Sequence, residues 1–377
     1  MFQGIGFDGM NILFATGGTG GHISVALSLA KELSCKSEKY HVKFSLNFNS
    51  FFEKKLKKNK FDYVAYSLKM PNSFFTFTWI SFIIDNIKAF VKIFCFITKF
   101  KPDVIVGFGS YASIPAVFAG FLSFKKIKII LHEQNVIPGK ANRALSLLAS
   151  KVAVSFKASE NLFRRKAVYT GNFVDKDFFI VTKDNGVKEL KLKSNKFTIV
   201  VVGGSQGARA INQLFIKAAN CIDDSIKKNI QVIHICGAKD YDNIRQNYDS
   251  LAVIDYQIIA FSDKMPLILA ASDLIISRAG ATSIAEISAV GRPSILIPYP
   301  YAGNHQKFNA QVLEDNKAAI VFDEGSISEQ ILADKIVALI NDRQRLKFMA
   351  QASKNLADPE STNRMEYLIN KSYENTK

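Results

Sequence analysis

Residues 277–310 have the sequence SRAGATSIAEISAVGRPSILIPYPYAGNHQKFNA, and this stretch decides the fold. Just before it, Asp273–Ser277 predicts a buried strand that runs into the small-residue turn Arg278–Ser283. A helix begins at about Thr282, so its free backbone N–H groups would point beyond the strand end, where an anion binds well. The alternative is an ordinary strand–turn–helix unit whose small residues serve packing alone.

Two polar positions add to this prediction. Glu286 lies one turn into the helix, where its carboxylate could accept hydrogen bonds from both hydroxyls of a ribose. After a second predicted strand, Pro293–Pro298, the polar run Asn304–Lys307 opens another helix and brings amide and imidazole groups to the same edge. The segment therefore predicts a place for a diphosphate, a ribose and a sugar.

The rest of the chain repeats the α/β pattern. Strand-like apolar runs alternate with helical stretches, which is typical of parallel sheets covered on both faces. The pattern breaks near Gly171–Ser194, and 377 residues suffice for two cores, so we expect two Rossmann-like domains with a ligand cleft between them. The expected strands are Asn11–Ala15, His41–Leu46, Val104–Val106, Ile127–His132 and Lys151–Val154 in the first domain, and Phe197–Val202, Ile230–Cys236, Val253–Ile259, Asp273–Ser277, Pro293–Pro298 and Ala319–Phe322 in the second.

Composition narrows the class of protein. The chain is 48% hydrophobic and 22% charged, as in globular proteins, and its four cysteines form no CxxC pair. Scattered cysteines fit a reducing compartment and disfavour a disulfide framework or a structural zinc site. The N-terminal residues lack a basic region followed by a continuous apolar run, so we expect no signal peptide and a cytoplasmic protein.

The net charge of +16 indicates an anionic partner: nucleic acid, an anionic membrane or anionic ligands. No RNP, zinc-finger or helix-turn-helix signature accompanies the charge, so we do not expect nucleic acid. The basic cluster Lys54–Lys60 could equally be a solvated helix end.

Phe74–Phe100 is the most apolar segment of the chain. Asp85, Lys88 and Lys92 interrupt it, so no uncharged run approaches the roughly 18–20 residues of a membrane span. With Ser81, these residues recur at helical spacing and form one polar stripe on an otherwise apolar helix. Core packing accounts for most of the apolar side chains, while the aromatic residues and nearby lysines indicate contact with an anionic membrane surface.

Polar turns follow three predicted strands of the first domain. In Thr16–His22 (TGGTGGH), the glycines let backbone amides approach a ligand closely, although the dinucleotide fingerprint is not matched. His22 would be a competent general base in a cleft, or could merely cap the helix. Gly107–Ser113 and His132–Asn135 end two other strands, so a polar substrate could lie across all three turns. The second domain repeats the theme at Gly203–Ala208.

No metal or other cofactor is expected. The DxD sequence Asp175-Lys176-Asp177 lies between the domains rather than at a strand end. An enzyme that uses a nucleotide sugar without a metal must offset the diphosphate charge with helix N-termini and basic groups.

Six motifs, in this order and spacing, resemble glycosyltransferase family 28: GGTGGH, GFGSYAS, HEQN, GGSQGA, SRAGATSIAE and NHQKFNA. The resemblance runs from about Asn11 to Asn363 and is to the peripheral-membrane N-acetylglucosaminyltransferases of peptidoglycan synthesis. It implies the GT-B fold, with domains at 1–171 and 172–354 and a C-terminal helix, about 355–377, that crosses back onto the first domain. It also implies the cytoplasmic face of the cell membrane, with the segment Phe74–Phe100 as the membrane patch.

The activity that the resemblance implies is inverting transfer of N-acetylglucosamine from UDP-N-acetylglucosamine to lipid I. The acceptor is the C4 hydroxyl of the muramyl sugar, and the products are lipid II and UDP. His22, or a base that it orients such as Glu133, would take the proton from that hydroxyl.

Carried over position by position, the resemblance implies binding roles in both domains. Glu286 would hold the ribose, Ser262 the uracil through its backbone, and Gln306 the sugar hydroxyls. The acceptor would contact Gly18, Ser110 and Tyr111. The donor would contact Thr19, Gly20, Gly21, Asn135, Ser205, Ser262, Ala281, Thr282, Ser283, Ile284, Ala285, Glu286, His305, Gln306 and Asn309.

One position departs from the family pattern. Members usually have a GNPVR-like run whose arginine touches the donor, whereas this chain has Gly171–Asp175 (GNFVD). Either Asp175 points away from the diphosphate or another base, such as Arg278, takes the place of that arginine.

Three other functions remain open at this point. A UDP-N-acetylglucosamine 2-epimerase shares the fold and donor but needs no apolar, basic surface, so the segment Phe74–Phe100 counts against it. A lipid galactosyltransferase of plastid type fits HEQN and NHQ less well. A non-catalytic module that binds a lipid or a nucleotide is the third.

Overall fold

The computed structural model describes residues 9–17, 20–68, 76–204, 207–249, 251, 254–301 and 303–374. The chain divides into two compact units, which we call unit 1 (Met1–Phe173 and Glu360–Lys377) and unit 2 (Val174–Pro359). Unit 1 is therefore built from both ends of the chain, because the C-terminal helix α16 (Ser361–Glu374) belongs to it.

Unit 1 contains a seven-stranded sheet in the order β3-β2-β1-β4-β5-β6-β7, and its strand pairs are parallel. The order reverses beside β1, where Ile12 pairs with Val42 on one side and with Val104 on the other. Such a switch point opens a ligand crevice beyond the carboxyl ends of the strands. The strands are β1 (Met10–Thr16), β2 (Tyr40–Asn47), β3 (Tyr63–Tyr66), β4 (Val104–Gly107), β5 (Lys128–Glu133), β6 (Lys151–Val154) and β7 (Ala167–Tyr169).

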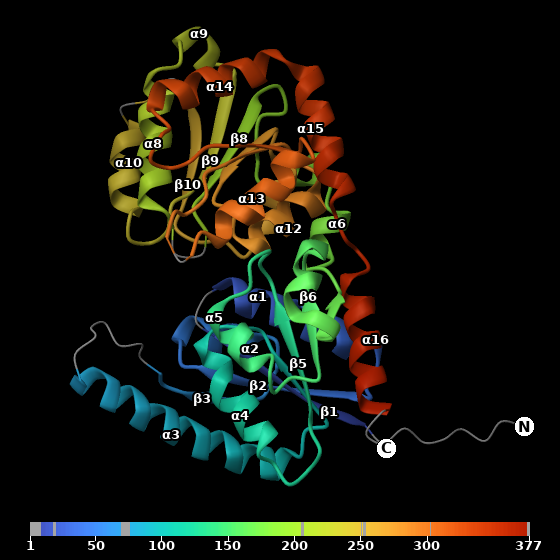
Figure 1. Cartoon of the computed structure of the whole chain (residues 1–377). Coiled ribbons are helices and arrows are strands. Elements are labelled where there is room, and N and C mark those ends of the chain that lie inside the picture. The colour runs from blue at the N-terminus through green and yellow to red at the C-terminus, as the bar shows by residue number, and fades with distance from the viewer. Residues whose placement is uncertain are drawn as a thin grey trace, which may run out of the picture. The chain divides into compact units, whose positions relative to one another are not determined.

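Helices cover this sheet, and α16 contributes to the core of unit 1. The rings of Phe14 and Phe44 meet edge to face at 5.6 Å, and Met365 and Ile369 of α16 lie in the same buried cluster. Figure 1 shows α3 and α4 side by side in this unit. Besides α16, the helices of this unit are α1 (Gly20–Lys36), α2 (Ser50–Lys58), α3 (Thr76–Phe100), α4 (Ile114–Phe121), α5 (Lys140–Leu145) and the 3-10 segments η1 (Tyr111–Ser113) and η2 (Lys157–Lys166).

Unit 2 has a parallel six-stranded sheet in the order β10-β9-β8-β11-β12-β13, the doubly wound Rossmann order. Its strands are β8 (Phe197–Val202), β9 (Ile230–Ile235), β10 (Asp255–Ile259), β11 (Leu274–Ser277), β12 (Ser294–Leu296) and β13 (Ala319–Val321). Its helices are α6 (Asp177–Ile180), α7 (Lys183–Glu189), α8 (Arg209–Asn220), α9 (Asp224–Lys227), α10 (Tyr241–Asp249), α11 (Met265–Ala271), α12 (Ala281–Val290), α13 (His305–Asp315), α14 (Glu329–Asn341) and α15 (Arg343–Asn355).

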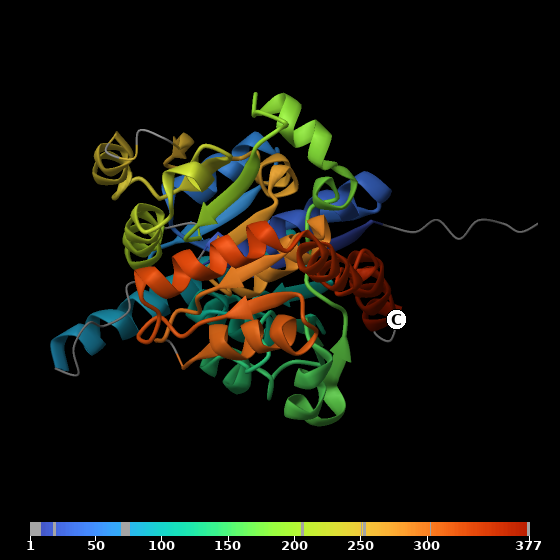
Figure 2. The same ribbon diagram turned by 90° about the horizontal axis from the view of Figure 1, so that it is seen from above.

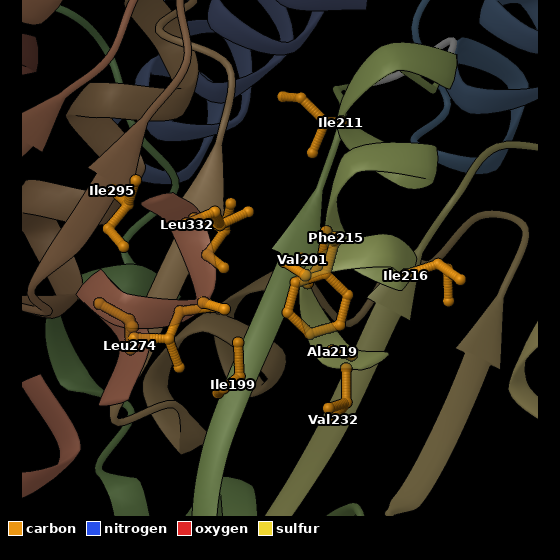
Figure 3. Packing of buried hydrophobic residues seen from close by; sticks show 14 of the residues in the cluster. Ile199, Val201, Ile211, Phe215, Ile216, Ala219, Val232, Leu274, Ile295 and Leu332 are labelled. Carbon is orange, nitrogen blue, oxygen red and sulfur yellow. The ribbon is translucent and has the colours of Figure 1, made fainter. Parts of the chain in front are cut away.

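The core of unit 2 lies between its sheet and helices α8, α10 and α14. Ile199 and Val201 alternate along β8 toward Phe215 of α8, as Figure 3 shows. Leu332 of α14 joins the same cluster, and α14 runs alongside α8 (Figure 2). Full burial of one such large apolar side chain contributes about 1.5–3 kcal/mol, so these contacts hold α8 and α14 on this face of the sheet.

The two-sheet α/β class predicted from the sequence is confirmed, and so are all eleven predicted strands, with ends that differ by a few residues. Two strands of unit 1, β3 and β7, are absent from that prediction. Both are edge strands, of four and three residues.

Helix α3 (Thr76–Phe100) has one side in the core and another exposed. Ala89, Ile93 and Ile97 are at most 2% exposed, whereas Ile83, Ile87 and Val91 exceed 50% exposure. No helix among the described residues is long and apolar enough to cross a membrane.

Candidate functional site

His22 lies against the turn that follows β4. Its Nε2 would be 3.5 Å from a Cβ atom at Gly109, and Nδ2 of Asn142 would be 3.2 Å from the same atom. Gly109 has a φ of +80°, so glycine suits both the backbone conformation and the close approach. Three segments of unit 1 thus bring His22, Gly109 and Asn142 together at the carboxyl edge of the sheet.

His22 is neutral at physiological pH. Burial lowers the pKa of its imidazole from 6.5 to about 4. The residue as a whole is still partly exposed at the start of α1. A neutral, partly accessible imidazole can accept a proton from a hydroxyl group, as a general base must.

Glu133, in contrast, is bound on all sides by its own loop. Its Oε1 accepts hydrogen bonds from the backbone N–H of Asn135 at 2.9 Å and from Asn135 Nδ2 at 3.2 Å. Its Oε2 accepts from the N–H of Gly139 at 3.0 Å and from Asn142 Nδ2 at 2.8 Å. The residue is only 2% exposed, so this geometry favours a role in holding the loop over the role of base predicted for Glu133.

His132 connects this loop to the chain segment that leaves unit 1. Its Nε2 lies 3.2 Å from both the carbonyl oxygen of Gly171 and Oγ of Ser155. Its ring stacks on Phe173 with the centroids 4.4 Å apart. The phenylalanine at the family's proline position therefore completes a buried stack, and burial lowers the pKa of His132 to about 4.

The predicted acceptor residues Ser110 and Tyr111 lie in the turn beside the glycine-rich loop. Asn47 Nδ2 donates to Oη of Tyr111 at 3.2 Å, and Ser110 Oγ accepts from the N–H of Ala112. A Cβ atom at Gly17 would lie 2.9 Å from the Cβ of Ala112, so the two turns touch. Tyr111 and His22 therefore both belong to the edge formed by β1 and β4.

In unit 2, helix α12 begins directly at the turn after β11, as the sequence predicts. Gly280 is its N-cap residue and has no side chain to satisfy the first N–H groups, which leaves them for an anion. Thr282, Ser283, Ala285 and Glu286 are partly exposed, whereas Ala281 and Ile284 are buried. The carboxylate of Glu286 thus lies on the accessible side of the helix, near its positive end.

Gln306 and Asn309 of α13 (His305–Asp315) hold the α12 turn in place. The Oε1 atom of Gln306 accepts from the N–H of Ala279 at 3.2 Å and from the N–H of Tyr299 at 2.9 Å. These bonds fix the amide so that its Nε2 group remains a donor. Asn309 is fully buried and donates to the carbonyl of Ala279 at 3.2 Å, a position that favours support of the turn over direct contact with a sugar.

Arg278 does not replace the missing arginine. Its guanidinium donates to the carbonyls of Ile297 and Pro298, forms an ion pair with Glu324 and lies over the ring of Tyr299. Asp175 accepts from the N–H of Asp177 at 3.3 Å at the start of the short helix α6. Because Arg278 is bound to neighbouring protein groups, the structure favours the alternative in which Asp175 points away from the diphosphate. Its carboxylate instead accepts a hydrogen bond within its own turn.

The remaining predicted residues fall into two groups. Gly20 and Gly21 begin α1, Ser262 accepts from the N–H of Lys264 at 3.0 Å, and His305 is the first residue of α13. Gly18, Thr19 and Ser205 lie outside the described residues, as does the start of the segment Phe74–Phe100. No group of three or more His, Cys, Asp or Glu side chains that could hold a metal ion occurs among the described residues.

Asn142 is a site residue that the sequence does not reveal. It lies in α5, nine positions after Glu133, and outside any of the six motifs. Its only signal is a polar residue in a short helix directly after HEQN. Its amide joins the carbonyl of His132, the carboxylate of Glu133 and the turn at Gly109.

One buried histidine in each unit makes stability depend on pH. Burial lowers the pKa of His132 to about 4 and that of His234 in β9 to about 3, both below the usual 6.5. The folded state therefore binds fewer protons, and the stability present above pH 6.5 is lost as the pH falls toward 4. We expect a loss of about 2 kcal/mol per histidine at pH 5, measured by hydrogen exchange of β5 and β9 amides in urea. His234→Gln should leave β9 less sensitive to pH, and equal protection at pH 7 and 5 would contradict the prediction.

Comparisons with known proteins cover nearly the whole chain. Residues 12–154 match the glycosyltransferase family 28 N-terminal domain, and residues 198–365 match its C-terminal domain. The chain is 36% identical over 371 residues to the UDP-N-acetylglucosamine--N-acetylmuramyl-(pentapeptide) pyrophosphoryl-undecaprenol N-acetylglucosamine transferase of Halothermothrix orenii, covering 96% of this chain and 98% of that protein. It is 37% identical over 349 residues to the protein of the same name from Wolbachia pipientis wMel, covering 91% and 94%.

Solved structures agree on the fold. MurG of Acinetobacter baumannii superposes with a TM-score of 0.73 at 24% identity, covering 96% of this chain and 99% of that one. A UDP-GlcNAc 2-epimerase of Neisseria meningitidis has a TM-score of 0.69 at 14% identity, covering 96% and 100%. Both likenesses show the GT-B fold alone. The two domain matches and the full-length relatives show that the chain belongs to glycosyltransferase family 28, among its N-acetylglucosaminyltransferases.

Proposed function

We propose that this glycosyltransferase moves N-acetylglucosamine from UDP-N-acetylglucosamine to the C4 hydroxyl of the muramyl sugar of lipid I, with release of UDP. The observation that carries the proposal is full-length identity of 36% to a relative whose name specifies this donor sugar and a pyrophosphoryl-undecaprenol acceptor. The neutral His22 in unit 1 and the uncapped start of α12 in unit 2 supply the two kinds of group that such a transfer needs.

Unit 2 would bind the donor. The positive end of the α12 dipole offsets the charge of the diphosphate, and Glu286 accepts hydrogen bonds from the ribose hydroxyls. The two hydrogen bonds that Oε1 of Gln306 accepts orient its side-chain amide. The Nε2 group of the same amide then donates to a hydroxyl of the sugar. With Arg278 committed elsewhere, the helix dipole carries most of the stabilisation of the leaving UDP.

Unit 1 would bind the acceptor and deprotonate it. Nε2 of His22 takes the proton of the C4 hydroxyl while the hydroxyl oxygen attacks the anomeric carbon, and the bond from that carbon to UDP breaks with inversion. Ser110 and Tyr111 contact the acceptor beside Gly109. Glu133 acts as a brace: it holds Asn135, Gly139 and Asn142 and thereby the wall against which His22 packs.

We further propose that unit 1 attaches peripherally to the anionic cytoplasmic face of the cell membrane. Trp79, Ile80, Ile83 and Ile84 on α3 are 41–55% exposed, which is unusual for a contiguous set of large apolar side chains. The charge of +16 would add attraction to anionic lipids.

Release of UDP tests the function directly. Purified protein mixed with UDP-N-acetylglucosamine and a lipid I analogue should release UDP only when both are present, and the disaccharide product should appear in equal amount. Conversion of the donor into its C2 epimer without acceptor and without net release of UDP would indicate the epimerase instead. Binding of donor with no release under any condition would indicate a non-catalytic module, and transfer from UDP-galactose alone would indicate the galactosyltransferase.

Gln306→Glu should raise the KM for the donor about tenfold while kcat and thermal stability change little. The carboxylate still accepts from Ala279 and Tyr299, but the donor group toward the sugar is lost, which costs about 1–1.5 kcal/mol. Gln311→Glu, on the exposed part of the same helix, adds the same charge and serves as the control. An unchanged KM in Gln306→Glu would remove this residue from the donor site.

A further inference from the structure

An open apolar groove of about 380 Å³ lies between α3 and α4 of unit 1. It is lined by Phe82, Ile83, Asn86, Ile87 and Phe90 of α3 and by Ile114, Pro115, Phe118 and Leu122 of α4 and its C-cap. Both sets recur at three- and four-residue spacing, so each helix presents one continuous stripe to the groove. The rings of Phe90 and Phe118 meet edge to face with centroids 6.2 Å apart and join the two helices.

The lining suits a hydrocarbon better than a peptide. It contains no charged residue, and the amide nitrogen of its one amide side chain, Asn86, donates to the carbonyl of Phe82 within the same helix at 2.8 Å. A peptide strand would bring backbone N–H and C=O groups that need hydrogen-bond partners, and each such group that is buried without a hydrogen bond costs free energy. A hydrocarbon chain needs no such partners and gains free energy from each CH₂ group that it buries.

The groove also begins next to the acceptor turn. Ile114 and Pro115 are the first residues of α4, directly after η1 (Tyr111–Ser113), and Ser113 Oγ donates to the carbonyls of Ala15 and Gly109. The amino end of α4 is thus tied to the turns around His22. A chain in the groove would therefore begin beside the turn that we assign to the acceptor.

We propose that this groove binds the first isoprene units of the polyprenyl chain of the acceptor lipid. The proposal rests on the proposed function for the identity of the acceptor. It goes further in assigning one chain to one groove, in contrast to general insertion of α3 into a bilayer. The groove would orient the acceptor, so that the muramyl sugar enters the site from a fixed direction.

Trp79 provides a direct readout of the groove. It is the only tryptophan of the chain, and its ring meets that of the lining residue Phe82 at 5.9 Å. We expect geranylgeranyl diphosphate alone, in a detergent without phospholipid, to change Trp79 emission saturably. Inorganic diphosphate at the same concentration should have no effect. Absence of saturable binding would overturn the proposal whatever the protein's activity.

Two matched variants separate the groove from the exposed surface. Ile87 lines the groove and is 57% exposed, while Val91, one turn further along α3, is 53% exposed and does not line it. Ile87→Glu should weaken binding of geranylgeranyl diphosphate tenfold or more, whereas Val91→Glu should bind as the wild type does. Ile87→Phe takes up more of the groove without adding charge or a second tryptophan and should also weaken binding. Equal losses in the two glutamate variants would indicate insertion into micelles and overturn the assignment.

Transfer assays then place the groove in the reaction. With an acceptor that carries a geranylgeranyl chain, Ile87→Glu should raise KM about tenfold and leave kcat unchanged; with an ethyl group in place of the chain, it should match the wild type. If no variant and no acceptor gives transfer, the proposed function fails while the binding result still stands. If KM rises equally for both acceptors, the groove does not bind the chain.

Discussion

His22→Asn should lower kcat for sugar transfer by about 10²–10⁴-fold, with little change in KM for the donor. The imidazole of His22 is a neutral base beside the turn that follows β4, and asparagine keeps a polar group of similar size that cannot take up a proton. Single-turnover kinetics with saturating donor and acceptor would measure the chemical step without product release.

The pH profile adds a second test of the same residue. Because burial lowers the pKa of His22 to about 4, the free enzyme holds the base form at every pH above about 5. We therefore expect kcat/KM to stay flat from pH 8 to 5 and to fall reversibly toward pH 4. In the complex, the negative charge of a bound diphosphate would raise this pKa and move the acid limb of kcat upward.

The control for His22 is Tyr111→Phe, which keeps the ring and removes only the hydroxyl that accepts from Asn47. We expect less than a tenfold loss of kcat there. A His22→Asn variant that keeps wild-type kcat would show that another group is the base. A kcat/KM midpoint near the usual 6.5 in the wild type would show that His22 is solvated in the free enzyme.

Glu133→Gln should destabilise unit 1 by about 2–5 kcal/mol and abolish most of the activity as a consequence. Four N–H donors point at the carboxylate. Glutamine offers one acceptor oxygen and turns an NH₂ group toward at least one donor, which leaves buried polar groups without partners. Hydrogen exchange of β5 amides and urea denaturation would report the loss.

Measuring both the stability and the activity of Glu133→Gln distinguishes a structural role of Glu133 from a role as the general base. If Glu133 were the base, Glu133→Gln would lose activity at wild-type stability, and kcat alone would fall. Glu38→Gln, at an exposed position of the same unit, should change stability by less than about 0.5 kcal/mol. Asn142→Ala should reproduce part of the Glu133→Gln loss, because it removes one of the four donors.

Local sequence patterns predict much of the fold. β8 and β9 are mostly apolar, with Thr198, Gln231 and His234 as the polar residues, and this pattern is typical of a sheet covered on both faces. The turn before α12 consists of the small residues Ala279–Ala281. The edge strands β3 and β7 are not predicted from the sequence, because their pairing with β2 and β6, and not a pattern in their own residues, makes them strands.

The sequence predicts part of the candidate site as well, and the structure supplies the rest. The sequence predicts that His22, Glu133, Gln306 and Glu286 matter, but gives Glu133 and His22 the same kind of role. Their surroundings separate them: four donors from the loop after β5 and from Asn142 of α5 surround the buried Glu133, whereas His22 lies beside Gly109 and is partly exposed. Likewise, Arg278 is a plausible substitute for the missing arginine until its carbonyl and carboxylate partners are known.

The sequence by itself determined the two-sheet α/β class, the order of the strands that carry the turns, and the family, because these depend on residue periodicity and on short motifs. The tertiary structure alone decided which polar groups are committed to protein partners and which are accessible. It also placed Asn142 beside His22 and formed the apolar groove from α3 and α4. These features depend on contacts between segments far apart in the chain, and no local pattern records which donor will meet which acceptor.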